Sequence, residues 1–225
     1  MAGITRRSGF GVFLFVAGMF LARAVSASLI SGITASTDMT TEVGYALSNI
    51  VNGSGLSGGP ALTGQHENAS ATNAWLSTDV TGNVIFDLGD SYHLAGLTLW
   101  NTNWNHTQPS KKGKYGMDEV TILYSLHGSA FTAIGGAATS FPKQNSTSHI
   151  SPVSLSFPAI TADMVKFMIR GNHNGPATGL AEVQFDGTRV IKYATDLTRV
   201  PEPATLSLMG VGLAGFGFMR RVKRS

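Results

Sequence analysis

Hydrophobic and polar residues alternate through most of the region between residues 28 and 188. In "NVIFDLG" the alternation puts Val84, Phe86 and Leu88 on one face. The same period of two recurs in "EVTILYS", "VSLSF", "VKFMIR" and "EVQFDG". Successive side chains of a strand point to opposite faces, so this pattern predicts antiparallel strands with one buried face. Because the region has no sustained helical period, the sequence predicts an all-β fold.

Long polar segments separate these strands. Three of them are "NGSGLSGGPALTGQHENASATN", "NTNWNHTQPSKKGKYG" and "GNHNGPATG". Strands joined by long connections are typical of a β-sandwich or jelly roll rather than a hairpin meander. Binding residues often lie on long loops that a rigid sheet supports. We therefore expect function to reside in these segments.

The C-terminal end has a composition of its own. Pro201, Glu202 and Pro203 precede an almost uncharged run over residues 204–219, and Arg220 and Arg221 open a basic cluster behind it. As a helix the run would span about 24 Å, somewhat less than a hydrocarbon core of about 30 Å. Basic residues stay on the cytoplasmic side. We therefore expect an apolar C-terminal helix that acts as a membrane segment with help from its flanks.

These residues resemble the bacterial PEP-CTERM sorting signal, with Val200 to Pro203 as the motif, a glycine-rich apolar run and a basic end. The resemblance implies that exosortase, a membrane protease-transferase, recognises residues 200–225 and cleaves near Pro201 to Pro203. It also implies transient membrane retention and a place in the envelope, on the surface or in the extracellular matrix of a Gram-negative bacterium, commonly one that makes exopolysaccharide and forms biofilm. An ordinary single-span anchor with a chance Pro-Glu-Pro is the alternative.

The N-terminal end has the order of a secretory signal peptide. Arg6 and Arg7 precede an apolar stretch, and small residues follow in "ARAVSASL". Signal peptidase cleavage after Ala27 is favoured over cleavage after Ala24, because small residues then precede the cut and Arg23 is kept away from it. We predict a signal peptide over residues 1–27, with an uncleaved anchor as the alternative.

The basic character of the whole chain belongs to its two ends. Residues 28–199 contain nine Lys or Arg and twelve Asp or Glu, a formal charge of −3, although the full chain carries +3. Nucleic-acid-binding domains usually present a basic surface, so we expect no nucleic-acid partner. The chain has no cysteine, which excludes disulfides and thiolate chemistry.

Seven landmarks in register resemble the discoidin or coagulation-factor type C family, whose fold is the galactose-binding-like jelly roll. They cover about 155 residues and are "ITAS", "LSNIVNG", "AWLS", "VIFDLGDSYHLAGLTLWN", "VTILYSLHGSAFTAIG", "VKFMIRG" and "GLAEVQFDG". The resemblance implies a jelly-roll domain over residues 28–188, with a linker over 189–199. It also implies that Trp75 in "AWLS" packs in the core.

No catalytic pattern stands out in the sequence. "GLSGG" matches a nucleophile elbow around Ser57, but that elbow needs a strand before it and a helix after it, whereas Ser57 lies among glycines. The aspartates at 87, 90 and 186 fall in predicted turns, and Asp118 and Glu119 open a strand. We therefore expect a protein that is not an enzyme.

Two polar loops combine the groups that bind sugars, namely an aromatic plane and planar hydrogen-bond donors. The candidate ligand-binding residues are Trp104, Asn105 and His106 in one loop, and Arg170, Asn172, His173 and Asn174 in the other. Trp104 could equally pack within its loop, and Arg170 could be an ordinary sheet-face residue. The hypothesis requires both loops to lie at the same end of the sandwich.

The family resemblance also implies a structural calcium ion between "NIVNG" and Glu182. Calcium prefers carboxylate and backbone oxygens. Asn52 stands where the family often has aspartate, which keeps an oxygen but removes a charge. Glu182 could instead be an ordinary strand-end residue.

The sequence therefore predicts an exported, non-catalytic carbohydrate-binding module that binds an extracellular polysaccharide. The alternative is a structural protein of the polysaccharide matrix in which the sandwich has no small ligand.

Overall fold

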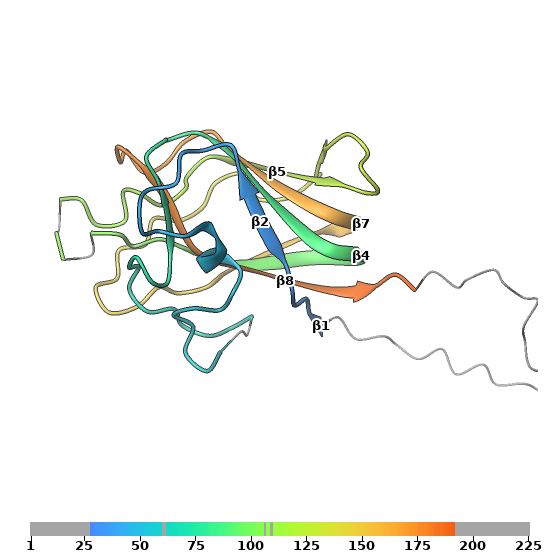
Figure 1. Ribbon diagram of the computed structural model, residues 1–225, viewed down its shortest axis with the longest axis horizontal. Coiled ribbons are helices and arrows are strands. Elements are labelled where there is room, and N and C mark those ends of the chain that lie inside the picture. The colour runs from blue at the N-terminus through green and yellow to red at the C-terminus, as the bar shows by residue number, and fades with distance from the viewer. Residues whose placement is uncertain (1–27, 60–61, 106, 109, 192–225) are drawn as a thin grey trace, which may run out of the picture. The chain divides into compact units, whose positions relative to one another are not determined.

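Antiparallel strands are the main regular elements of the described part of the chain, which covers residues 28–191 apart from 60–61, 106 and 109 (Figure 1). The structure is a computed structural model. Its strands are β1 (Ser28–Leu29), β2 (Thr34–Thr37), β3 (Trp75–Ser77), β4 (Gly82–Asn101), β5 (Val120–Ser125), β6 (Thr132–Ala133), β7 (Val153–Ile169) and β8 (Thr178–Arg189). A 3₁₀ turn, η1 (Leu47–Ile50), is the one helical element of these residues. The prediction of an all-β fold is confirmed.

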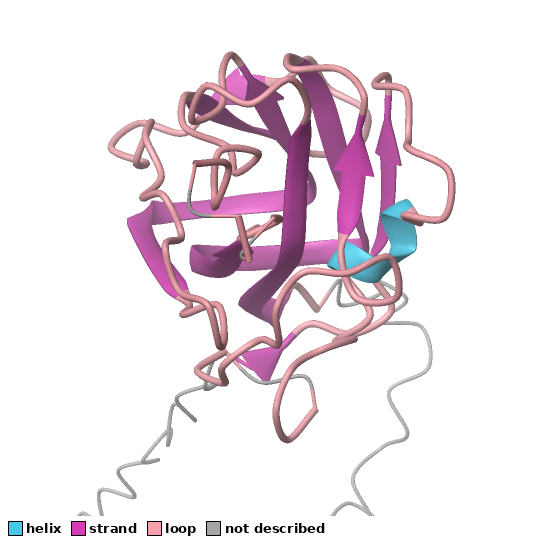
Figure 2. Cartoon of the chain, turned by 90° about the vertical axis from the view of Figure 1, so that its left-hand side faces the viewer, coloured by secondary structure: helices cyan, strands magenta, loops and turns pink. Residues whose placement is uncertain are grey.

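The long strands β4 and β7 connect two layers. The first part of β4, residues 82–87, pairs with β2 and with the end of β7, which in turn pairs with β5. The second part, residues 92–101, pairs with β8 and with the beginning of β7. Irregular pairing between Asp87 and Tyr92 separates the two parts. Figure 2 shows the strands running in two directions, as this division into layers requires.

The alternating hydrophobic residues face each other between the layers. Phe86 on β4 is fully buried. Its ring centroid lies 5.0 Å from that of Phe167 on β7 and 5.3 Å from that of Phe185 on β8. Val84, Val165 and Val183 belong to the same buried cluster. The period of two thus identified the core faces correctly, because sheet packing buries every second side chain.

A second apolar cluster lies outside the two layers, under the long loops. Trp100 is fully buried there, and its Nε1 donates to Gly64 O at 2.8 Å. The other members are Leu56, Ala69, Ala74, Ile150 and Ala181. Trp75 is also buried, as the family resemblance implied, and its Nε1 donates to Thr41 Oγ1 at 3.0 Å. The loop from residue 54 to 74 is therefore packed onto the sheet.

Three predicted segment boundaries were wrong. "VSLSF" and "VKFMIR" are not separate strands but parts of β7. "NVIFDLG" is only the beginning of β4, so Asp87 and Asp90 lie in a strand that bends rather than in a turn. Asp186 likewise lies within β8. Antiparallel strands can pass from one layer to another through such irregularities, which a hydrophobic pattern does not reveal.

The predictions for both ends concern residues outside the described part. They include the signal peptide over 1–27 with cleavage after Ala27, most of the linker, the sorting signal and the apolar segment 204–219. Among the described residues, no helix is long and apolar enough to cross a membrane.

Candidate functional site

The long connections leave the sheet from one end of the fold. Gly82 at the start of β4 pairs with Ile169 at the end of β7. Asn101 at the other end of β4 donates to Met117 O, and Met117 bridges Asn172 just beyond β7, so both ends of β4 lie there. The start of β7 lies there too, because Val153 pairs with Leu99 near the end of β4. The start of β5 is at the same end, since Val120 pairs with Ile169. Figure 1 shows these loops gathered on the left of the view, which we call the loop end.

The two loops predicted to bind a ligand lie side by side. His173 N donates to Gly116 O at 3.2 Å, and Gly179 N donates to Tyr115 O at 2.8 Å. Met117 and Asn172 form an antiparallel bridge. The contact involves the C-terminal half of the first loop, so Trp104 is not part of it.

Trp104 is partly buried and packs against the second apolar cluster. Its ring meets Tyr45 edge to face, with centroids 4.9 Å apart and planes at 87°. Asn105 has a left-handed φ of 60°, and His106 lies outside the described residues. Tyr45 was not predicted from the sequence, because a contact between segments so far apart in the chain leaves no local pattern.

Asn172 uses its side chain to shape its own loop. Nδ2 donates to Ala177 O at 2.6 Å and to Gly175 O at 3.2 Å, and Oδ1 accepts from Gly175 N at 3.0 Å. Asn174 is exposed and has a φ of 63°. These bonds hold the loop's turn, as asparagine commonly does. They leave little hydrogen-bonding capacity on Asn172 for a ligand.

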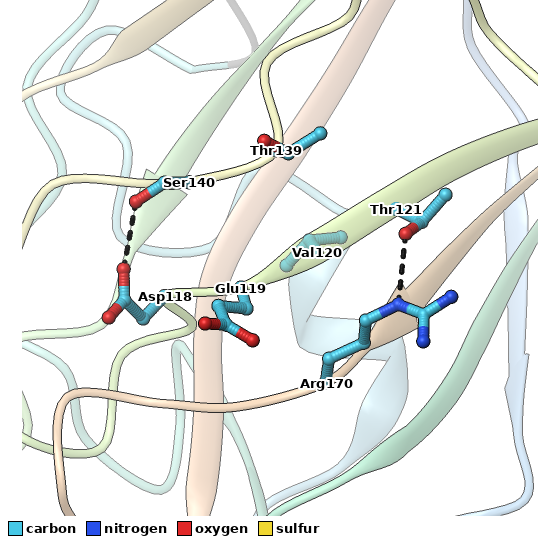
Figure 3. Close-up of a pocket in the computed structure, with 7 residues that line it drawn as sticks. All are labelled: Asp118, Glu119, Val120, Thr121, Thr139, Ser140 and Arg170. Carbon is cyan, nitrogen blue, oxygen red and sulfur yellow. Dashed lines mark hydrogen bonds between the residues drawn. The ribbon is translucent and has the colours of Figure 1, made fainter.

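Arg170 lies in a polar pocket beside the start of β5 (Figure 3). The pocket has a volume of about 420 Å³, and its other lining residues are Asp118, Glu119, Val120, Thr121, Thr139 and Ser140. Arg170 Nε donates to Thr121 Oγ1 at 3.1 Å, and Arg170 N donates to Glu119 O at 2.8 Å. We call this site the Arg170 pocket.

Of the two acidic side chains in the Arg170 pocket, Asp118 is the one that contacts other side chains of the site. Ser140 Oγ donates to Asp118 Oδ1 at 2.8 Å, and His173 Nδ1 lies 3.7 Å from Asp118 Oδ2. The pocket therefore brings Arg170 and His173, predicted from the sequence, close to Asp118, which had been interpreted as a strand-opening residue. The side chains come from three segments, 118–121, 139–140 and 170–173.

Two charged groups of the Arg170 pocket remain available. Among the described residues, nothing pairs with the terminal guanidinium nitrogens of Arg170 or with the Glu119 carboxylate, and both side chains are exposed. A guanidinium fork donates two parallel hydrogen bonds, and a carboxylate accepts two. The pocket can therefore bind a polar ligand that offers neighbouring donors and acceptors.

The two predicted calcium ligands differ in their surroundings. Glu182 is fully buried, and both of its carboxyl oxygens lie 3.2 Å from Gly53 N. Burial raises the pKa of Glu182 to about 8, although hydrogen bonds from Gly53 and Gln184 act in the opposite direction. Asn52 is exposed, and its Oδ1 accepts from Ser54 N at 2.8 Å. Within the described residues, no three His, Cys, Asp or Glu side chains are grouped as metal ligands. The described side chains thus offer a cation one carboxyl group at this place, that of Glu182.

Comparison with known proteins identifies the C-terminal motif and the fold. Residues 199–221 match the family model for the PEP-CTERM protein-sorting motif. No curated protein matches the chain. A fragment of a candidate chitobiase from Bacteroides thetaiotaomicron is similar in structure, with 15% identity, a TM-score of 0.51 and coverage of 76% of this chain and 98% of that chain.

Two carbohydrate-binding modules from Clostridium perfringens are also similar. One, in complex with GalNAc-β-1,3-galactose, has 16% identity, a TM-score of 0.49 and coverage of 70% of this chain and 99% of its own. The other, the family 32 module of NanJ in complex with galactose, has 15% identity, a TM-score of 0.49 and coverage of 72% and 99%. The chain thus carries a PEP-CTERM sorting motif at residues 199–221, which indicates an exported protein of the bacterial cell envelope, and the described residues that precede the motif have an antiparallel jelly-roll fold.

Proposed function

We propose that this protein is an exported, non-catalytic carbohydrate-binding protein that binds extracellular polysaccharide through the Arg170 pocket. The observation that carries the proposal is the pair of available groups in this pocket, the Arg170 guanidinium and the Glu119 carboxylate. A sugar presents neighbouring hydroxyl groups that both donate and accept. The pocket volume of about 420 Å³ is within the range of about 300–1,000 Å³ that small-molecule sites have.

The hydroxyl groups of Thr121 and Ser140 hold the charged residues of the pocket in place. Thr121 accepts from Arg170, and Ser140 donates to Asp118. A fixed side chain loses less conformational entropy on binding. The Asp118 carboxylate and the Arg170 guanidinium would thus meet a sugar ring in a preorganised geometry.

The arrangement around His173 supports a non-catalytic role. Ser140 hydrogen-bonds to Asp118 and not to the imidazole. Activation of a serine nucleophile needs a hydrogen bond between its hydroxyl group and the base. We therefore assign a structural role to Asp118, Ser140 and His173, which shape the pocket and do not catalyse a reaction.

Export and processing form the second part of the proposal. The signal peptide over 1–27 would direct secretion, and segment 204–219 would hold the protein in the membrane of a Gram-negative cell until exosortase cleaves near Pro201 to Pro203. Mass spectrometry of the protein from its native host tests this. We expect a mature chain that begins near Ser28 and ends between Val200 and Pro203. An intact C-terminal end on fully exported protein would contradict it.

Calcium remains part of the proposal as a structural ion. Glu182 and backbone oxygens near Asn52 would hold it, and the ion would neutralise the buried carboxylate. Calcium accepts such oxygen ligands in flexible geometry.

Binding of the purified domain to exopolysaccharide from its host and to a glycan array tests the sugar-binding function. We expect Arg170→Ala to weaken binding at least about tenfold, which corresponds to about 1.4 kcal/mol. Lys143→Ala, which removes a positive charge outside the pocket, is the control and should bind normally.

Trp104→Ala is the second variant, because Trp104 was predicted from the sequence as a sugar platform. If Trp104 contacts the ligand, this variant loses binding while its melting temperature stays close to that of the wild type. A large loss of thermal stability would instead assign Trp104 to packing against Tyr45. If the wild-type domain binds no glycan at all, the alternative of a structural matrix protein replaces the proposal.

A further inference from the structure

The outer face of the second layer has a polar hollow that shares no lining residue with the Arg170 pocket. It lies over β4, β7 and β8 and has a volume of about 370 Å³. Its lining includes Gly96 and Thr98 from β4, Ser154 and Ser156 from β7, and Asp186 from β8. We call it the sheet-face hollow.

Strand alternation explains why polar groups converge in the sheet-face hollow. Leu97, Leu155 and Phe185 are buried in the core between the layers. Their neighbours along each strand therefore point outward. Gly96 pairs with Ser156, and Thr98 pairs with Ser154, which sets the hydroxyl groups next to one another across the sheet.

Gly96 is one of the residues that line the hollow. A Cβ atom at this position would clash with Leu155 O, because the strands approach closely beside an irregular pairing between Leu94 and Gly96. The close approach of the two backbones therefore requires glycine. Leu62 and Thr63, from the loop packed on this layer, border the same space.

The polar groups of the hollow are largely available. Thr98 Oγ1 and Ser154 Oγ lie 3.2 Å apart and bond to each other. Among the described residues, nothing hydrogen-bonds to Ser156 Oγ or to the Asp186 carboxylate. Ser154 and Ser156 are exposed, and Asp186 is partly exposed. The hollow thus offers a carboxylate and a row of hydroxyl groups on a rigid sheet.

We propose that the sheet-face hollow is a second sugar-binding site, in which Asp186 accepts hydrogen bonds from two neighbouring hydroxyl groups of one sugar residue. Ser154 and Ser156 add hydrogen bonds, and Leu62 contacts the apolar edge of the ring. The inference rests on the proposed function in its ligand class, but it uses none of the residues of the Arg170 pocket. Two sites on one domain favour a polymer over a free sugar, because the second binding event becomes intramolecular.

Amide chemical shifts of isotope-labelled domain report on each site separately. The probes are the methyl glycosides of galactose, glucose, mannose and N-acetylglucosamine at tens of millimolar. We expect at least one probe to shift the amides of Gly96, Ser154, Ser156 and Asp186, and to do so equally in Arg170→Ala. Asp186→Asn should abolish these shifts. Glu67→Gln, which removes one exposed carboxylate elsewhere, should leave them unchanged.

The outcomes separate the two proposals. Shifts confined to the Arg170 pocket would overturn the second site and leave the proposed function standing. Shifts confined to the sheet-face hollow would support the second site and remove the Arg170 pocket from the proposal. The second site is also overturned if no probe shifts its amides, or if Asp186→Asn retains the wild-type shifts.

Discussion

The ionisation of Glu182 couples the stability of the domain to pH. Burial raises the pKa of this carboxyl group from 4.5 to about 8. The folded state therefore keeps a proton that the unfolded state releases between these two values. The resulting stabilisation is complete below about pH 4.5 and is lost as the pH rises through about 8, with a slope of up to about 1.4 kcal/mol per pH unit. We expect the melting temperature to fall over this window and Glu182→Gln to remove that fall.

Bound calcium would change the pH dependence of the melting temperature. A divalent cation favours the ionised carboxylate, so calcium should raise the melting temperature more at pH 8 than at pH 5 and should have no effect on Glu182→Gln. A chelator that leaves the melting temperature unchanged at both pH values would contradict the calcium proposal. The pH dependence without calcium would still stand, because it depends only on the burial of Glu182.

Only some residues of the Arg170 pocket could be predicted from the sequence. Arg170 and His173 could be selected because polar and aromatic residues concentrate in their loop. Asp118 and Glu119 were interpreted only as strand-opening residues, because their nearness to Arg170 results from the pairing of β5 with β7. Pairing across the sheet joins residues about fifty positions apart, and no local pattern encodes it.

The strands were predicted more reliably than their ends. Hydrophobic alternation depends only on which face is buried, so the core positions of β4, β5, β7 and β8 followed directly from the sequence. The bends in β4 and β7 depend on irregular pairing with neighbours, near Asp87 and Leu94 for β4. In the sequence, the two bent strands β4 and β7 therefore looked like several short strands.

The loop from residue 54 to 74 is hydrogen-bonded to Ile150 through the backbone of His66, whose side chain is buried. His66 N donates to Ile150 O at 3.0 Å, and Ile150 N donates to His66 O at 2.7 Å. The imidazole Nδ1 lies 2.7 Å from Glu67 O, while Nε2 has no partner among the described residues. Burial lowers the pKa of His66 from 6.5. Protonation therefore costs more in the folded loop than in the unfolded chain.

The stabilisation from His66 depends on pH in the opposite direction to that from Glu182. It is present above about pH 6.5 and is lost as the pH falls through the lowered pKa. We expect the amides of His66 and Ile150 to exchange faster at pH 5 than at pH 7, after correction for intrinsic rates. His66→Gln should show the same protection at both values. Equal protection of the wild type at both pH values would contradict this role of His66.

At the scale of residues 28–191, the continuous strands β4 and β7 make the two layers a single folding unit. Each strand supplies hydrogen bonds to both layers, so we expect the two layers to lose their pairing together. Phe86 adds a side-chain connection, since its ring meets Phe167 and Phe185. A small domain with such shared elements is expected to unfold in one cooperative transition.

Truncation of Phe86 tests this cooperativity. We expect Phe86→Ala to lower the free energy of unfolding by about 3–5 kcal/mol, because it leaves a cavity among buried rings. Phe131→Ala is the matched control: Phe131 is only partly buried, and Lys166 Nζ lies 4.3 Å from the centroid of its ring. A partly exposed cation–π contact contributes about 0.5–1 kcal/mol. Urea titrations followed by tryptophan fluorescence and far-ultraviolet circular dichroism should give coincident transitions for both variants. Two separate transitions in Phe86→Ala would show that the layers unfold independently.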